Sequence, residues 1–462
     1  MQRYGPKAEL YRRGKERHSM ESYNNISHVF IPFCYSDQDA FGTLVRTLQA
    51  DESWTLVHDE ITYMLKYVAD KIDSNNPDNC QCFHFALTEQ ARASLGVVSP
   101  EDWCHITREY RDAPEEYRFQ IKQIQLYCFS TTVCILAFQL RFEKNDPLWV
   151  SSAQYYLKKV SRENIYHTCA QTGLTPAPFT LLELAKGLMR QLDAGLSFQF
   201  FFYANPTTER ANFLTLLEVE QKADYRYELY YLRRCYGSGF LYTENQALDR
   251  QEIYSSSQDT VWGVSPEAAV CLVCPSLGRS DFLRGTFYRN FNAQYLFMYV
   301  LLLHQKYVLY MFLTQIGVGS QNNLAALEQY RRQLYEFETN FVFSCVTEVP
   351  QYQNLYERMT QAFALQKLYE DVREPIVSLT EIRQSTAESK QKNRDKRTNK
   401  ALFMLSLLSF FSALIDSFDF VDSFFAWFLG ADGIKMVQVF FILVIIAALV
   451  FVMINLFHSG DD

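Results

Sequence analysis

Two apolar runs lie near the end of the chain and differ in how polar residues are spaced within them. The second run, 436–457, has 22 residues, of which only Gln438 and Asn455 are polar. A helix of this length would reach roughly 33 Å at about 1.5 Å per residue, which matches the hydrocarbon core of a bilayer. The pattern predicts a transmembrane helix over 436–457.

The first run, 401–428, carries polar residues at helical spacing. Its mostly apolar part ends at Ile415, and aspartates follow. At about 100° per residue, five polar residues fall within an arc of about 80°: Ser409, Ser412, Asp416, Asp419 and Ser423. Because carboxylates that face lipid are costly, this stripe needs water or partner helices. The pattern predicts a first span that lines the pore of a symmetric oligomer, with 436–457 packed outside it.

The charges around the two runs predict their orientation. The loop 429–435 is short and rich in turn formers, so the runs should form a hairpin. Six cations, the basic collar, precede the first run, whereas the loop has only Lys435; the collar is Lys390, Lys392, Arg394, Lys396, Arg397 and Lys400. This asymmetry places the N-terminal part and both termini in the cytoplasm, the collar at the lipid headgroups, and Asp422 and Asp432 at the outer mouth.

A tail anchor is the alternative for this region. In that case 436–457 alone would span the membrane, and 401–428 would lie in the interface as an amphipathic helix. A tag at Asp462 distinguishes the two topologies, because a tail anchor places the C-terminus outside.

The part before the runs reads as two regions. Residues 21–286 predict a mixed α/β domain, with strands at 26–34, 118–130, 131–142, 196–203, 211–219 and 260–274, and helices at 151–160 and 180–192. The run 131–142 is apolar enough to be buried on both faces. Thr180 and Glu183 have the spacing of a capping box.

From about residue 287 the pattern is that of long helices. The helix over 292–317 contains His304, Gln305 and Lys306 at its centre, which favours a buried core helix over a third span. Helices at 322–347 and 351–373 follow, and Pro375 predicts a kink. The polar stretch 376–400 then leads directly into 401–428, so a helix over 351–428 would form a stalk of about 115 Å.

Composition and charge bear on the class of protein and on the compartment in which it lies. The 462 residues carry a net charge of −8, which disfavours a generic nucleic-acid binder. Residues 1–20 form a basic N-terminal arm without the apolar core of a secretory leader, and 458–462 form a short tail. We expect the eleven cysteines to be reduced thiols.

No motif predicts an enzyme or a resident cofactor. Cys271 and Cys274 have a zinc-knuckle spacing, but they lie in an apolar, strand-like run where buried thiols are the usual finding. Cys80, Cys82 and His84 also lack a convergent fourth ligand. The glycine-rich pieces 236–240 and 317–321 lack the lysine and the spacing of a phosphate-binding loop.

This order of elements resembles the CorA-like divalent-cation (Mg²⁺) transporter superfamily. The shared features are an N-terminal α/β domain, a helical hairpin, a long stalk helix that becomes the first span, a short loop and an outer second span. The residue-level likeness is concentrated in 323–457. The resemblance implies a homopentamer with its pore on the first span and both termini in the cytoplasm.

The chain departs from the family at its signature. The family has Gly-Met-Asn at the end of the first span, whereas the corresponding stretch here is Ser-Phe-Asp-Phe-Val-Asp (417–422), followed by AWFLGADG. The basic tail typical after the second span is also absent. The resemblance therefore carries over the architecture and not the selectivity residues.

Together these patterns predict an α+β protein with a C-terminal two-helix transmembrane hairpin, located in the cell membrane. The leading function is a homo-oligomeric channel or transporter for cations, with membrane lipid and further copies of the chain as partners. Rings of Asp416 and Asp419 would contact a transported or regulatory divalent cation such as Mg²⁺. The rival is a membrane-anchored effector whose cytosolic domain binds a small, nucleotide-like signal.

Overall fold

The computed structural model describes most of the chain up to Phe428. The described residues are 25–35, 40–58, 61–76, 79–108, 117–160, 165–168, 173–174, 178–192, 195–201, 210–220, 222, 224–274, 280–319, 324–428, 439–440, 443–444 and 447. Within these ranges the side chains of 107–108, 165–168, 246–247, 280, 316–319, 324–327, 379–380, 382–384, 387, 411 and 414–428 are not described.

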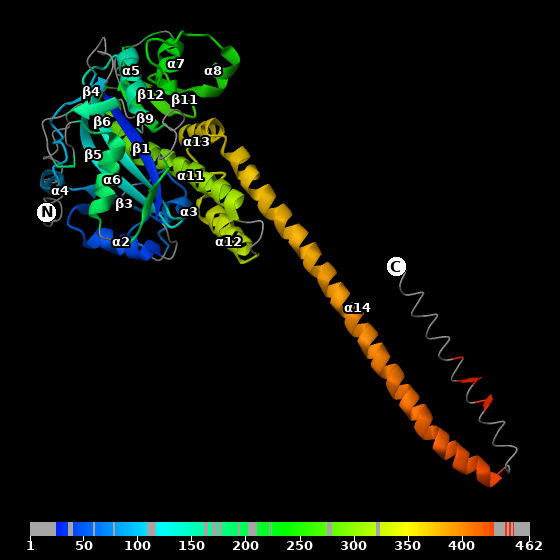
Figure 1. Cartoon of the computed structure of the whole chain (residues 1–462). Coiled ribbons are helices and arrows are strands. Elements are labelled where there is room, and N and C mark those ends of the chain that lie inside the picture. Colours follow the sequence, from blue (N-terminus) through cyan, green and yellow to red (C-terminus); the bar gives the residue numbers. More distant parts are fainter. Residues whose placement is uncertain are drawn as a thin grey trace, which may run out of the picture. The chain divides into compact units, whose positions relative to one another are not determined.

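The chain divides into two units, Met1–Val377 and Ser378–Asp462. The first unit, here called the sheet unit, is of mixed α and β structure (Figure 1). The predicted boundaries after residues 286 and 400 stay predictions.

A twelve-stranded sheet forms the centre of the described part of the sheet unit. Its strands run in the order β10-β11-β12-β9-β1-β6-β5-β3-β2, with β4 beside β5 and β7, and β8 beside β1. All described pairs are antiparallel except β9 and β12. The strands are β1 (Asn25–Tyr35), β2 (Trp54–Leu56), β3 (Cys82–Leu87), β4 (Cys104–Arg108), β5 (Arg118–Phe129), β6 (Val133–Phe142), β7 (Ile165–Thr168), β8 (Phe198–Phe200), β9 (Asn212–Glu218), β10 (Ile253–Ser257), β11 (Thr260–Val264) and β12 (Ala268–Val273).

Helices cover both faces of this sheet. The helices that precede β10 are α2 (Phe41–Ala50), α3 (Lys66–Ala69), α4 (Glu89–Ser94), α5 (Pro147–Leu157), α6 (Leu181–Gln191), α7 (Arg226–Arg234) and α8 (Gln246–Glu252). Those that follow β12 are α9 (Ser280–Phe282), α10 (Tyr288–Asn290), α11 (Leu296–Gly319), α12 (Leu324–Phe341), α13 (Pro350–Ala362) and α14 (Leu365–Phe428). Two π-helical turns, Leu283–Phe287 and Phe291–Tyr295, join α9, α10 and α11.

The two faces of the sheet belong to two separate cores. One core packs the sheet against α2, α4, α5, α6 and α7, and the other packs it against α3, α11, α12, α13 and the first turns of α14. Strand β6 contributes Leu136 and Phe138 to the first core and Ile135 and Ala137 to the second. The prediction that 131–142 is buried on both faces is therefore confirmed.

Several local predictions are confirmed and two are wrong. Thr180 caps α6: its hydroxyl accepts a hydrogen bond from the backbone N–H of Glu183, and the carboxylate of Glu183 accepts one from the backbone N–H of Thr180. The stretch 260–274 is not one strand but a pair, β11 and β12, joined by a tight turn. The stalk helix does not begin near 351: the chain breaks at Phe363–Ala364, where Ala364 has a left-handed φ of 51°, and Pro375 lies inside α14.

One described helix, Leu283–Gln315, is long and apolar enough to cross a membrane. However, 78% of its most apolar 18-residue stretch is buried within this chain. Every side chain from Tyr295 to Leu303 is buried in the second core. The sequence-based expectation of a core helix is confirmed here, because this helix already has protein on the sides that lipid would cover.

Candidate functional site

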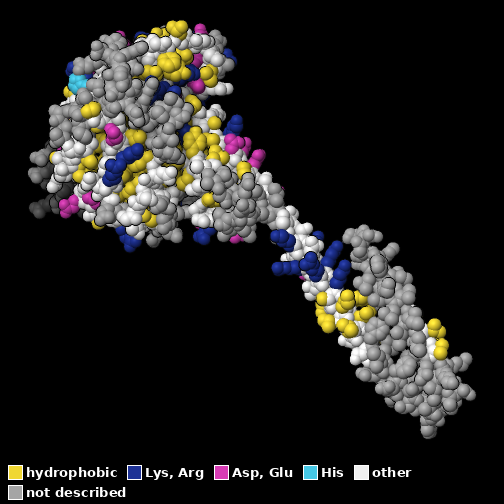
Figure 2. Space-filling view, viewed as in Figure 1, with side chains coloured by type: hydrophobic (Ala, Val, Ile, Leu, Met, Phe, Trp, Pro, Cys, Tyr) yellow, Lys and Arg dark blue, Asp and Glu magenta, His cyan; other side chains and the backbone are white. Residues whose placement is uncertain are grey.

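The apolar segment of α14 is exposed in the single chain. Leu402, Leu405 and Leu408 expose 56%, 61% and 65% of their surface, and Phe403, Met404 and Phe410 are similarly exposed. Figure 2 shows this hydrophobic group on the helix directly after a group of cations. A contiguous apolar surface of this kind marks a contact with lipid or with another protein surface.

The group of cations is the basic collar. All residues from 390 to 400 are exposed, and each lies on the unbroken helix α14. Helical spacing distributes Lys390, Lys392, Arg394, Lys396, Arg397 and Lys400 over more than one side of the helix. Such a distribution suits a segment that is surrounded by anionic headgroups more than one that binds a ligand on a single face.

The predicted pore stripe lies on the same helix. The backbone is helical from Ser409 through Ser423, as the stripe requires, and Ser409 and Ser412 are exposed. The side chains of Asp416, Asp419, Asp422 and Ser423 lie outside the described part of the structure, and Asp432 lies outside it altogether. The predicted role of these residues stays a prediction.

The predicted second span falls mostly outside the described residues. Of 436–457 the structure describes Val439, Phe440, Leu443, Val444 and Ala447, all helical and exposed. The loop 429–435 is not among the described residues, so the predicted hairpin is carried forward as a proposal.

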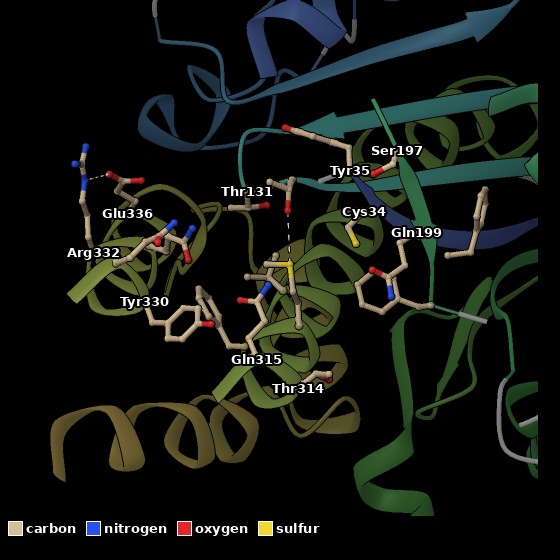
Figure 3. Close-up of a pocket in the computed structure, with 18 residues that line it drawn as sticks. Cys34, Tyr35, Thr131, Ser197, Gln199, Thr314, Gln315, Tyr330, Arg332 and Glu336 are labelled. Atoms are coloured by element: carbon tan, nitrogen blue, oxygen red, sulfur yellow. Dashed lines mark hydrogen bonds and ion pairs between the residues drawn. The ribbon is translucent and has the colours of Figure 1, made fainter. Parts of the chain in front are cut away.

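A cavity of about 870 Å³ is a second candidate site, and it lies within the sheet unit. Its walls come from the ends of β1 and β8, from the turn between β5 and β6, and from α11 and α12 (Figure 3). Figure 3 shows Gln199 on the sheet side and Gln315 on α11 at the same hollow, with Tyr330 of α12 nearby.

The lining of this cavity is polar but has no surplus charge among its described residues. Arg332 and Glu336, one helical turn apart on α12, form an ion pair of 3.0 Å. The remaining lining residues are uncharged amides, hydroxyls, aromatic and aliphatic side chains and one thiol: Cys34, Tyr35, Thr131, Thr132, Ser197, Gln199, Phe200, Phe201, Val308, Met311, Phe312, Thr314, Gln315, Gln329, Tyr330 and Gln333.

The turn between β5 and β6 fixes one wall of the cavity. The Oγ1 atom of Thr131 lies 2.6 Å from Nε2 of His304, and Thr132 donates to the sulfur of Met311 over 3.6 Å. The ring of His304 stacks on Phe129 with centroids 3.8 Å apart. Burial holds the pKa of His304 well below its usual range, so the residue acts as a neutral packing group between sheet and helix.

Helix α12 also contacts the base of α14. The hydroxyl of Tyr369 donates to the carboxylate of Glu338. Leu334 and Phe337 of α12 belong to the same buried core as Leu365 and Val372 of α14. One side of α12 therefore faces the cavity, while the helix also packs against the start of the stalk.

The cysteines singled out from the sequence are buried in the sheet unit. Cys271 lies in β12 and Cys274 directly follows it, both are buried, and burial raises the pKa of both thiols. Cys80 is also buried and donates to the carbonyl of Cys82. Among described residues no group of three or more histidine, cysteine or acidic side chains has the arrangement of a metal site.

Sequence reasoning did not find the cavity. Its residues come from five separate segments, none of which forms a recognisable motif. The four glutamines would have been the only compositional signal, and glutamines are common on solvated helix faces.

Comparisons with known proteins give no match: no family model fits the sequence, no curated protein is similar to it, and no solved structure is similar to the fold.

Proposed function

We propose that this chain is a membrane protein that assembles as a homo-oligomer and conducts cations through its first span, 401–428. The observation that carries the proposal is the exposed apolar segment of α14 directly after an exposed basic collar. In water this segment would leave six large side chains, Leu402 to Phe410, uncovered on one helix. Lipid tails and neighbouring copies of the segment are the surfaces that would cover them.

The sequence of the first span supports a pore over a simple anchor. A helix that only anchors the chain has no use for a stripe of serines and aspartates, which cost free energy when they face lipid. In a ring of copies the same stripe would enclose water. Carboxylate rings at Asp416 and Asp419 would then raise the local concentration of cations such as Mg²⁺.

The continuity of α14 supports coupling between the two units. The helix is unbroken from Leu365, which packs in the sheet unit, to Phe428 in the apolar run. Under this proposal a change at the base of the helix would act on the first span through this continuous backbone. The collar would hold the cytoplasmic end at the headgroups, with 436–457 as the outer span and both termini in the cytoplasm.

Flux measurements test this proposal. The full chain is reconstituted into proteoliposomes and Mg²⁺ entry is followed with an enclosed dye. Asp416→Asn combined with Asp419→Asn should lower the flux on the order of ten-fold, because the focusing field at the mouth is lost. Asp395→Asn, which changes an exposed carboxylate between Arg394 and Lys396 on the same helix, is the matched control and should keep the flux. Equal fluxes in all three proteins would exclude the pore assignment.

Two further measurements test the assembly and the topology. Native mass spectrometry of the detergent-solubilised chain should give one closed ring, five-membered if the CorA-like resemblance holds, and a monomer contradicts the channel. A protease-sensitive tag after Asp462 should be cut only from the cytoplasmic side. Cutting from outside would instead support a tail anchor.

The second candidate function is a membrane-anchored effector that senses a small ligand. The cavity between the sheet and the helices α11 and α12 favours it, because it is of ligand size and α12 packs against the base of α14. The two candidates are compatible, since a ligand in the cavity could control the opening of a pore.

A further inference from the structure

We propose that the cavity of the sheet unit binds an uncharged ring compound that carries several hydrogen-bonding groups, of about the size of a nucleoside or a disaccharide. The volume of about 870 Å³ lies within the range of pockets that hold small organic ligands. The binding itself does not depend on the pore. Only its effect on the membrane part rests on the proposed function.

The charge balance of the lining selects an uncharged ligand. Arg332 and Glu336 contribute one charge of each sign to the lining and pair with each other, so the described lining offers a phosphate no net positive charge. A divalent cation would find a single carboxylate, which already has a partner, whereas such ions need several oxygen ligands with negative charge among them. A charged ligand would therefore exchange part of its hydration for a lining that carries no net charge of the opposite sign.

The hydrogen-bonding capacity of the lining is large, and part of it is not taken up by other described groups of the protein. The side-chain amides of Gln199, Gln315 and Gln329 make no hydrogen bond to any residue that the structure describes. Each amide offers two donor hydrogens and an acceptor oxygen. The three come from three separate elements that line the cavity, β8, α11 and α12. A ring with donors and acceptors around its edge could satisfy them together.

Apolar surface completes the site. Phe200 and Phe312 are buried, with 7% and 2% of their surface exposed, and both line the cavity. Phe200 stacks on Phe33 at 5.0 Å, which fixes the orientation of its ring. Held aromatic faces of this kind cover the flat face of a base or the apolar face of a sugar. The amides would then form hydrogen bonds with the donors and acceptors at the edge of the same ring.

A ligand at this place would bridge the sheet to the helix that supports the stalk. Gln329 and Tyr330 line the cavity from α12, and Glu338 of the same helix accepts the hydrogen bond of Tyr369 at the base of α14. Filling the cavity should hold α12 against the sheet. The expected consequence is a change in the position of the first turns of α14 relative to the sheet.

Binding is tested with the full chain in mild detergent by isothermal titration and by the shift of the unfolding temperature. The uncharged probes are adenosine, uridine, glucose and maltose. Their charged counterparts are AMP, UMP and glucose 6-phosphate, and MgCl₂ alone tests for a cation site. We expect at least one uncharged probe to bind and to bind more tightly than its phosphorylated counterpart. Which arm binds, nucleosides or sugars, identifies the source of the ring.

Variants place the binding in the cavity. Gln199→Leu and Gln315→Leu should each weaken the affinity about ten-fold, because each leaves ligand groups without a partner. Gln361→Leu replaces an exposed glutamine of α13 outside the cavity and should leave the affinity unchanged. Since Gln199 and Gln329 are exposed, Gln199→Leu and Gln329→Leu test the site even if Gln315→Leu unfolds the protein.

The proposal is overturned if no uncharged probe binds, if a phosphorylated probe or Mg²⁺ binds more tightly, or if the cavity variants keep full affinity. The double variant Asp416→Asn, Asp419→Asn should bind the probe normally. Loss of the pore function and loss of the ligand site are therefore seen in separate measurements.

Discussion

Acidification should destabilise the sheet unit through His28, a buried residue in the middle of β1. Its Nε2 lies 3.0 Å from Oδ1 of Asn292, and Nε2 of Gln139 donates to the same oxygen over 3.2 Å. Because that oxygen can only accept, Nε2 of His28 carries the proton and Nδ1 does not. Nδ1 is buried without a hydrogen-bond partner among the described residues. Protonation would place a donor and a charge where neither is accommodated.

The size of the effect follows from the pKa. Burial is the main cause that lowers the pKa of His28 from 6.5 to about 4; the bond to Asn292 opposes this, and the nearby His84 adds to it. A histidine whose pKa is lower in the folded chain stabilises the fold above the unfolded pKa, and this contribution is lost as the pH falls from about 6.5 to 4. The full difference corresponds to about 3 kcal/mol.

Urea unfolding of the full chain in detergent, at pH 7 and at about pH 4.5, measures the loss. The comparison is with His28→Gln, which keeps an amide donor but cannot titrate. On acidification, the free energy of unfolding should fall by about 2 to 3 kcal/mol more in the wild type than in the variant. His58→Gln, which changes an exposed histidine bonded to Ser74, should lose as much as the wild type. Equal losses in wild type and His28→Gln would refute the reasoning. Part of the loss of unfolding free energy should be common to the wild type and His28→Gln, because burial also lowers the pKa of His304.

Three other substitutions should change stability in defined directions. Arg233→Ala should destabilise the sheet unit by about 3 to 5 kcal/mol in urea unfolding, because Arg233 is fully buried and pairs with Asp249 and Glu252 at 2.7 Å each. Ala364→Gly should stabilise it by about 1 kcal/mol by the same assay, since the left-handed φ of 51° strains a residue with a Cβ. Lys306→Met should raise the unfolding temperature at pH 7. Because burial lowers the pKa of Lys306 to about 8, that gain should shrink as the pH rises above 8.

Much of the local structure could be predicted because it depends on neighbouring residues. The alternation of apolar and polar residues predicted β5, and the long apolar run predicted β6 as a strand buried on both faces. Thr180 and Glu183 predicted the start of α6. The basic collar and the apolar run that follows are also properties of the sequence, since a bilayer responds to hydrophobicity and charge along a single segment.

The position of the break before the stalk could not be predicted from the local sequence. Proline removes one backbone donor and favours a kink, which made Pro375 the expected site. In the structure Pro375 and its neighbour Glu374 are exposed, and the helix α14 continues through them. The chain bends instead at Ala364, between Phe363 and Leu365, which are both buried in the second core. The burial of these two side chains outweighs the strain at Ala364.

The sequence by itself determined the apolar segment 401–428, the basic collar and the strands β1, β5, β6, β8 and β9, because each depends on residues close together in the chain. Only the tertiary structure decided that β9 lies between β1 and β12, that Leu283–Gln315 is covered by protein, and that five distant segments enclose a neutral cavity. The reason is that these features arise from packing between residues far apart in the chain. Their free energy depends on which surfaces meet, and no single stretch of sequence contains that information.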